Sequence, residues 1–275
     1  MITRSQIKFH ETFQPELSYI SKILELGYNN FKGTKYDISD LTGIPTGKQK
    51  GKVEPHIKYA TYMGLIDHVY DGKSYSLSLT RVGEEVFVQD PYLHETLTHW
   101  LCHYFISSHH SQAYQWIYLI KHAYRGFFQT CSNSFLLDEA NLQFQTNCTF
   151  EEMFGPIKRS YIDGAFSDLD YIDWNQELTF LEQTENPEYV FLYAFILLDL
   201  WESVFPNRKE LTFDEISNVL LYNRYLGLNV EDCNSVFDCL SDESIISINR
   251  QLVPSTLMKL QEAADVLPFL YSRLL

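Results

Sequence analysis

The first 90 residues carry an ordered series of local signals that few folds accommodate. The expected segments are, in chain order, a helix over 13–31, a short helix over 37–43, a helix over 53–66, a hairpin about Asp71-Gly72 and a helix that begins at Thr80. Helix, short helix, turn, helix, hairpin and helix is the order of a winged helix-turn-helix. The sequence therefore predicts such a domain over residues 1–90.

Individual residues support these boundaries. Asp37 is a candidate N-cap for the short helix, and Gly43 a candidate stop for it. Pro55 suits the first turn of the next helix, because its missing N–H would have no partner there. The dipeptide Asp71-Gly72 is typical of a two-residue hairpin turn, and Thr80 is a suitable cap for the helix after the hairpin.

Cations gather at one place in a chain that is otherwise strongly acidic. The formal net charge is -15, yet residues 1–58 hold nine Lys and Arg against six Asp and Glu. Four lysines lie in the turn and at the start of the predicted recognition helix, where a helix-turn-helix meets phosphates. A solvated basic loop is the simpler alternative. The predicted DNA contacts are Lys48, Lys50, Lys52, Lys58, and, on the wing, Lys73 and Arg81.

The rest of the chain is expected to be mainly α-helical. Residues 91–185 form a helical middle region rich in aromatic side chains, in which 131–150 is interpreted as a polar connector. Residues 186–275 repeat the order of a winged helix with small β-hairpins, and a capping box at Thr212 and Glu215 opens one of its helices. The would-be recognition helix of this module is acidic, so a structural or protein-binding role is expected for it.

Composition limits the cellular setting. The most apolar run, over 189–201, is too short to cross a bilayer, and the N-terminus has no apolar segment typical of a secretory signal. Five cysteines without a Cys-X-X-Cys pair suit free thiols in a reducing cytoplasm. We therefore expect a cytoplasmic protein without a membrane partner.

Two further clusters could hold a metal ion. His99 and His103 are four residues apart on one helix, as zinc ligands often are. Clustered carboxylates could hold Mg²⁺ for phosphodiester cleavage, and the candidates are Asp163, Asp168, Asp170 and Asp173. Neither cluster completes a known motif, so packed histidines and solvated acids are the favoured interpretations and no metal ligand is assigned. A divalent ion as cofactor stays open.

The block "FHETFQPELSYISKILELGY" resembles a bacterial family of proteins of unknown function whose genes lie in DNA phosphorothioation clusters. The resemblance continues through "KVEPHIKYATYMGLI", "LTRVGEEVF" and "DPYLHETLTHWLCHYFIS", and weakly at "GPIKRSYIDGAF". It implies a role in anti-phage defence like that of the DNA-nicking component of such systems. His10 and Glu11 fall in the shared block, and imidazole beside carboxylate suits acid–base chemistry. The lysine-rich turn departs from the family pattern.

The leading expectation is thus a component of a phosphorothioation system that binds double-stranded DNA and for which strand nicking is a candidate activity. His10 and Glu11 are then the speculative acid–base pair, and other proteins of the system are expected partners. A second copy of the chain is a further candidate partner. The alternatives are a winged-helix transcriptional regulator of such a gene cluster and a scaffold without enzymatic activity.

Overall fold

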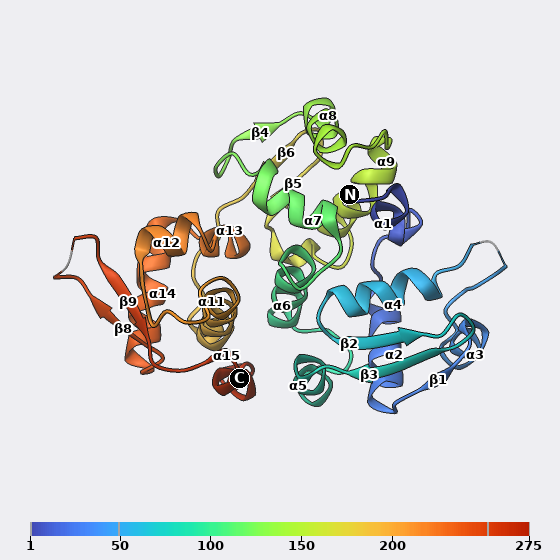
Figure 1. Ribbon diagram of the computed structural model, residues 1–275, viewed down its shortest axis with the longest axis horizontal. Coiled ribbons are helices and arrows are strands. Elements are labelled where there is room, and N and C mark those ends of the chain that lie inside the picture. The colour runs from blue at the N-terminus through green and yellow to red at the C-terminus, as the bar shows by residue number, and fades with distance from the viewer. Residues whose placement is uncertain (1, 49, 252, 275) are drawn as a thin grey trace. The chain divides into compact units, whose positions relative to one another are not determined.

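The protein is described here by a computed structural model that covers residues 2–48, 50–251 and 253–274 (Figure 1). The chain forms two compact units, Met1–Leu181 and Glu182–Leu275. Both are mainly α-helical, as the sequence predicts, and in the sheets each expected hairpin is joined by a third antiparallel strand. The proposed division of the first unit at residue 90 stays a prediction.

The N-terminal part of the first unit follows the predicted order of elements. Its helices and strands are α1 (Arg4–Ile7), η1 (Lys8–His10), α2 (Leu17–Tyr28), β1 (Lys32–Gly33), α3 (Lys35–Thr42), α4 (Val53–Tyr62), β2 (Ile66–Tyr70), β3 (Tyr75–Leu79) and α5 (Arg81–Gln89). The strands form one sheet in the order β1-β3-β2. Helices α2 and α4 pack on each other and against the hairpin, as Figure 1 shows.

Two local predictions in this part are wrong by a few residues. Thr34, not Asp37, caps α3, and Asp37 completes a capping box three residues later. The hairpin turn is centred on Gly72-Lys73, because Asp71 N–H donates to the Ser74 carbonyl. The Asp71 carboxylate accepts N–H groups from both Lys73 and Ser74, so Asp71 precedes the turn instead of occupying its centre. Gly43, at φ 72°, ends α3 as predicted.

The remaining part of the first unit surrounds a buried helix. It contains α6 (Thr96–Ser107), α7 (Tyr114–Tyr118), the π-helical turn η2 (Leu119–Ala123), β4 (Thr130–Cys131), α8 (Asn133–Phe144), α9 (Phe150–Met153), α10 (Gly155–Ile162), η3 (Ser167–Leu169), β5 (Ile172–Asp173) and β6 (Leu178–Phe180). Every residue of α6 from Leu97 to Ser107 is buried. The strands pair in the order β4-β6-β5.

The prediction of a polar connector over 131–150 is wrong, because α8 occupies most of it. Ser132 caps this helix by accepting the Phe135 N–H. The Trp174 indole N–H donates to the Asn133 side chain at 2.8 Å, which ties the start of α8 to a segment 41 residues later. The helix thus depends on a cap and a distant contact, and its own apolar periodicity is weak.

The second unit repeats the helix–strand–helix–hairpin order. Its elements are η4 (Pro187–Tyr189), α11 (Val190–Val204), β7 (Glu210–Thr212), α12 (Phe213–Asn218), α13 (Tyr222–Leu226), α14 (Val230–Asp242), β8 (Ile246–Asn249), β9 (Thr256–Lys259), α15 (Ala263–Val266) and η5 (Leu267–Phe269). The sheet order is β7-β9-β8. The apolar run is the buried helix α11, and the Thr212–Glu215 capping box is confirmed.

A close approach at Gly83 yields a first prediction. A Cβ atom on Gly83 would lie 1.7 Å from the Leu65 carbonyl oxygen, where α5 begins against the end of α4. Helix propensity alone would make Gly83→Ala stabilising by about 1 kcal/mol. We expect the opposite, a loss of about 3 kcal/mol, because the backbone of Leu65 would have to move. Urea unfolding would show this, with Val88→Ala on the exposed face of α5 as the matched control. A stabilised Gly83→Ala protein would contradict this packing.

Candidate nucleic-acid interface

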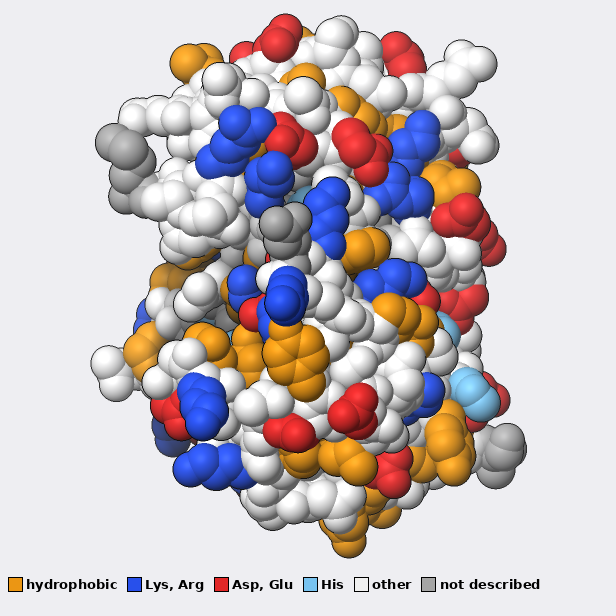
Figure 2. All heavy atoms as spheres, turned by 90° about the vertical axis from the view of Figure 1, so that its right-hand side faces the viewer, with side chains coloured by type: hydrophobic (Ala, Val, Ile, Leu, Met, Phe, Trp, Pro, Cys, Tyr) orange, Lys and Arg blue, Asp and Glu red, His pale blue; other side chains and the backbone are white. Residues whose placement is uncertain are grey.

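Contacts between its two ends hold the lysine-rich turn that joins α3 to α4. The Lys52 N–H donates to the Pro45 carbonyl at 2.7 Å and closes the turn. A Cβ atom on Gly51 would lie 2.5 Å from the Thr46 hydroxyl and 2.7 Å from its Cα, so the turn requires glycine there. Figure 2 views this face of the molecule, and Lys and Arg side chains gather across its middle.

The predicted cations differ in how they are engaged. Lys48 and Lys50 are exposed and form no ion pair within the part of the chain that the structure describes. Lys52 instead contacts the Glu16 carboxylate at 2.6 Å, with its ammonium group over the Phe13 and Tyr19 rings. The ion pair of Lys52 therefore links the starts of α2 and α4, whereas the exposed ammonium groups of Lys48 and Lys50 can contact a phosphate.

The wing carries the other two predicted cations. Lys73 lies at the tip of the β2–β3 hairpin and Arg81 at the start of α5, and both side chains are exposed. Beneath the wing, Glu54 accepts the Tyr75 hydroxyl at 3.1 Å and contacts Lys35 at 2.9 Å. The acid of α4 is thus engaged within the fold, by Lys35 and Tyr75, and not by the exposed Lys48 and Lys50.

The His-Glu-Thr-Phe block and α4 meet in one cavity. This cavity has a volume of about 550 Å³ and is lined by Arg4, Ser5, Lys8, Phe9, Glu11 and Lys58. The sequence brings Glu11 and Lys58 together only through the fold, since they are 47 residues apart. Three cationic side chains therefore surround one carboxylate at this site.

The backbone of the block is strained at the centre of this site. Glu11 and Thr12 are consecutive residues in the left-handed region, with φ of 49° and 72°. Such conformations cost about 1–3 kcal/mol for residues other than glycine and concentrate at functional sites. Among the residues that the structure describes, the buried oxygen Oε2 of Glu11 has no hydrogen-bond partner. This oxygen is buried as well as unpaired, so its hydrogen-bonding capacity is unsatisfied within the fold.

Ion pairs hold the block against the middle of the unit. Arg4 and Lys8 both contact Glu152, at 2.7 and 2.8 Å. The hydrogen bond from Lys8, with those from the Thr149 backbone and Arg4, lowers the pKa of Glu152 to about 2. Arg159 donates to the Thr12 carbonyl at 2.7 Å. Together these contacts hold Glu11 and Thr12 in their left-handed conformations.

His10 is fully buried, which bears on its predicted acid–base role. Its Nδ1 accepts the Thr12 N–H at 2.9 Å, so the neutral ring carries its proton on Nε2. Burial, with the nearby charges of Arg159 and Lys8, lowers the pKa of His10 to about 3. Because the lone pair already binds the backbone, this geometry fits a residue that positions Glu11 and Thr12. The catalytic assignment of His10 stays a prediction.

Both histidines considered for a metal ion, and the carboxylates of Asp168 and Asp173, are engaged in other contacts. His103 contacts the Tyr161 hydroxyl at 2.6 Å inside the core, and His99 contacts Asp168 at 2.8 Å. Within the described residues of the first unit, no three His, Cys, Asp or Glu side chains gather their ligand atoms within 4.8 Å of one another. These contacts fit the packed-histidine interpretation.

Sequence reasoning missed four residues of this site. These are Arg4, Lys8, Glu152 and Arg159. The spacing of four residues between Arg4 and Lys8, directly before the block, was a signal that they share one helical face. Arg159 lies in the "GPIKRSYIDGAF" segment, which already carried part of the resemblance. Glu152 gave no local signal beyond its capping box with Thr149.

The architecture defines a mainly α-helical protein with two compact units and a cationic face on the first. No family model and no curated protein matches the chain. Two crystal structures of SspB share its fold, one of them described as magnesium ion-bound. Their TM-scores are 0.77 and 0.76, at 16% and 17% identity, over 96% of this chain and 87% of each SspB chain. The resemblance expected from the sequence is thus confirmed at the level of the fold.

Among the described residues, no helix combines the length and the apolar character that crossing a membrane requires.

Proposed function

We propose that this chain is a DNA-binding component of a bacterial DNA phosphorothioation system in anti-phage defence, and that it nicks one strand of the bound duplex. The observation that carries the proposal is the cavity in which Arg4, Lys8 and Lys58 surround Glu11 beside α4. The likeness to SspB supports the process, since that protein has the same fold. A pair of such chains is a further proposal for its assembly.

The element order supports a winged helix-turn-helix in the first unit. In this interpretation α3 and α4 are the helix-turn-helix, α4 is the recognition helix and the β2–β3 hairpin is the wing. Lys48 and Lys50 before α4 then meet phosphates, and Lys73 and Arg81 flank the adjacent groove. Lys52 contributes indirectly, because its contact with Glu16 sets the position of the turn.

The second unit has the same order of elements but an opposing charge. Residues 182–275 hold fifteen Asp and Glu against six Lys and Arg. Glu231 and Asp232 occupy the first turn of α14, the counterpart of α4. Such a surface repels phosphates, so we assign this unit to structure or to contacts with other proteins of the system.

The cavity at Glu11 favours an anion over a metal ion. One of the SspB structures is described as magnesium ion-bound, which raises the question for this chain. Here Glu11 is the one carboxylate among the lining residues, and Glu152 outside the lining is already paired with Arg4 and Lys8. The lining thus offers few oxygen ligands and places the cation of Lys58 beside them, which disfavours a divalent ion. The residues present therefore do not fit a metal, and we derive no step through one.

A phosphodiester of the bound strand fits this cavity better. Lys8, Arg4 and Lys58 would stabilise its negative charge as it grows during cleavage. The Glu11 carboxylate, which lines the cavity, would accept a proton from an attacking water molecule as the new P–O bond forms. The P–O bond to one sugar oxygen would break, and that oxygen would take up a proton from solvent. His10 would hold the turn that presents Glu11, through its hydrogen bond to Thr12.

Glu11→Gln is expected to abolish plasmid nicking while duplex affinity is kept or increased. The substitution removes the proton acceptor and one negative charge but keeps the shape of the side chain. Relaxation of supercoiled plasmid and a binding titration measure the two effects separately. Asp40→Asn, on the exposed face of α3, is the matched control. Unchanged nicking by a folded Glu11→Gln protein would remove Glu11 from the mechanism.

A regulator without nicking activity is the second candidate, and the burial of His10 favours it. No exposed imidazole stands in the His-Glu-Thr-Phe block to transfer a proton. A sequence-specific footprint on DNA, with intact supercoiled plasmid after long incubation, would support this regulator and overturn the nickase. Binding to partner proteins without any DNA affinity would point to the scaffold.

A further inference from the structure

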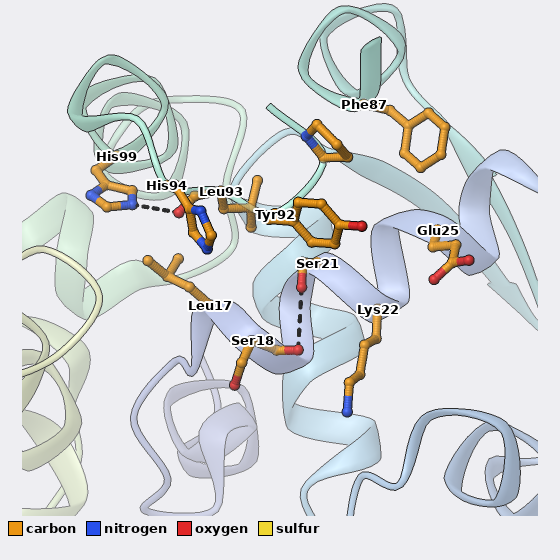
Figure 3. A pocket seen from close by; sticks show the side chains of 11 residues that line it. Leu17, Ser18, Ser21, Lys22, Glu25, Phe87, Tyr92, Leu93, His94 and His99 are labelled. Carbon is orange, nitrogen blue, oxygen red and sulfur yellow. Dashed lines mark hydrogen bonds between the residues drawn. The ribbon is translucent and has the colours of Figure 1, made fainter. Parts of the chain in front are cut away.

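A second and larger cavity lies on the first unit between α2 and the segment that joins α5 to α6 (Figure 3). Its volume is about 880 Å³, within the usual range of small-molecule sites. Aromatic side chains line one side, namely Phe87, Tyr92 and His94. The first turns of α2 line the other side with Ser18, Ser21 and Glu25.

Residues 91–94 line the side of the cavity that carries Tyr92, here called the wall, and the buried carboxylate of Asp90 holds them. Asp90 accepts the N–H groups of His94 and Glu95, at 2.8 and 3.0 Å, and the Thr98 hydroxyl at 2.7 Å. Within this wall Leu93 adopts the left-handed conformation, with φ of 57°, although its side chain is buried. A strained residue persists only where its surroundings hold it.

His99 holds Leu93 in this conformation. Its Nε2 lies 2.8 Å from the Leu93 carbonyl and its Nδ1 2.8 Å from the Asp168 carboxylate. Both partners are acceptors, so both ring nitrogens donate and the ring is an imidazolium. Burial opposes this charge, but the hydrogen bonds to Asp168 and Leu93 outweigh it and raise the pKa of His99. The wall is therefore preorganised, which is expected of a binding site.

The chemistry of the cavity selects against phosphate. The Lys22 ammonium group donates to the Thr42 carbonyl at 2.7 Å, and in Figure 3 this side chain points away from Tyr92. Glu25 contributes a carboxylate, so the ligand should be an uncharged or cationic ring with hydrogen-bond donors. Tyr92 is 69% exposed and its ring lies 5.9 Å from that of His94, which offers open aromatic faces for stacking.

The cavity is also adjacent to the lysine turn. Glu16, which precedes α2, contacts Lys52, and Lys22 binds the last residue of α3. Ser18 and Ser21 thus lie on a helix whose neighbouring face contacts both ends of that turn. Helix α2 therefore links the proposed DNA-contacting turn to the cavity.

We propose that this cavity binds a nucleobase, stacked on Tyr92 and hydrogen-bonded through its exocyclic amino group to Glu25. The base comes from the bound duplex as an extrahelical nucleotide; a free nucleoside presents the same chemistry. Cytosine, adenine and guanine carry such an amino group and thymine does not, so the site should favour the first three. The duplex source rests on the proposed DNA-binding function, whereas binding of a free nucleoside does not.

The first experiment titrates cytidine and thymidine into the full chain and follows protein NMR shifts. We expect saturable binding of cytidine that is at least tenfold tighter than that of thymidine. Tyr92→Ala should weaken cytidine binding more than tenfold, because stacking is lost. Phe128→Ala, another exposed aromatic residue of the first unit, is the control. Glu25→Gln should remove the preference for cytidine. The proposal is overturned if two results occur together. They are the absence of a saturable shift with any nucleoside at millimolar concentration and the absence of a fluorescence rise in the second experiment.

The second experiment places 2-aminopurine, a fluorescent base that brightens when a stacking neighbour is removed, next to a cytosine in a duplex, so that extrusion of the cytosine unstacks the probe. Binding of the wild-type chain should raise its fluorescence, and Tyr92→Ala should bind the duplex without that rise. Bound duplex without a rise, together with cytidine binding, overturns the duplex source and assigns the site to free nucleosides. Loss of duplex binding with intact cytidine binding contradicts the DNA-binding function and leaves the nucleobase site supported.

Discussion

Replacing Lys48, Lys50 and Lys58 together with alanine is expected to weaken duplex binding strongly and to flatten its dependence on salt. Each phosphate that a lysine neutralises contributes about 0.9 to the slope of log K against log salt, so the slope should fall by about 2.7. These three lysines are chosen for their positions in the structure. Lys48 and Lys50 are exposed and form no ion pair among the described residues, and Lys58 faces the cavity at Glu11.

A charge-matched control separates this effect from net charge. Lys121, Arg125 and Lys209 are exposed cations outside residues 1–90, and their triple replacement removes the same charge. That variant should keep the wild-type slope. Lys52→Ala tests the role of a lysine that is already paired with Glu16. Loss of this ion pair should lower the free energy of unfolding but change the salt slope little. Equal slopes for both triple variants would disprove the assignment of this face to DNA.

The protein is expected to lose about 5 kcal/mol of its free energy of unfolding between pH 7 and about pH 4.5. Two buried neutral histidines cause this. Burial lowers the pKa of His10 to about 3, and it lowers that of His56 to about 4. In the unfolded chain both bind a proton near pH 6.5. The unfolded state therefore takes up more protons as the pH falls below 6.5, and stability is lost in that window.

His99 acts with the opposite sign. Its folded pKa is raised, so its contribution is fully present below pH 6.5 and is lost as the pH rises through that raised value. Below pH 6.5 this contribution no longer changes with pH, so it leaves the loss that His10 and His56 cause there unchanged. Since whole domains are stable by only about 5–15 kcal/mol, the loss should bring the protein close to unfolding in mild acid.

Urea unfolding at a series of pH values measures this loss. His10→Asn keeps a hydrogen-bond acceptor near Thr12 but cannot be protonated, so the slope below pH 6.5 should fall by about half. His94→Asn replaces an exposed imidazole and should leave the slope unchanged. A stability that is flat from pH 7 to about pH 4.5 would show that His10 and His56 are not buried as neutral rings.

Local chemistry made much of the fold predictable. The stop at Gly43, the cap at Thr80 and the capping box at Thr212 each depend on residues within a few positions, and all three are confirmed. The run over 189–201 becomes the buried helix α11, because so apolar a segment has no stable place in water.

Predictions failed where distant residues decide the outcome. Helix α8 was missed because its apolar pattern is weak and because Trp174 secures its start from 41 residues away. The hairpin turn shifted by one residue because the Asp71 carboxylate binds two backbone N–H groups, an alternative that the dipeptide alone does not reveal.

The sequence by itself determined that positive charge gathers near residues 48–58 and that a histidine and a glutamate stand side by side in one block. Tertiary structure alone decided which of these groups is available. It pairs Lys52 with Glu16, buries His10, and brings Lys58 to the cavity where Glu11 keeps an unpartnered oxygen. The reason is physical: burial and ion pairing depend on distances between residues far apart in the chain, and only the packed fold sets those distances.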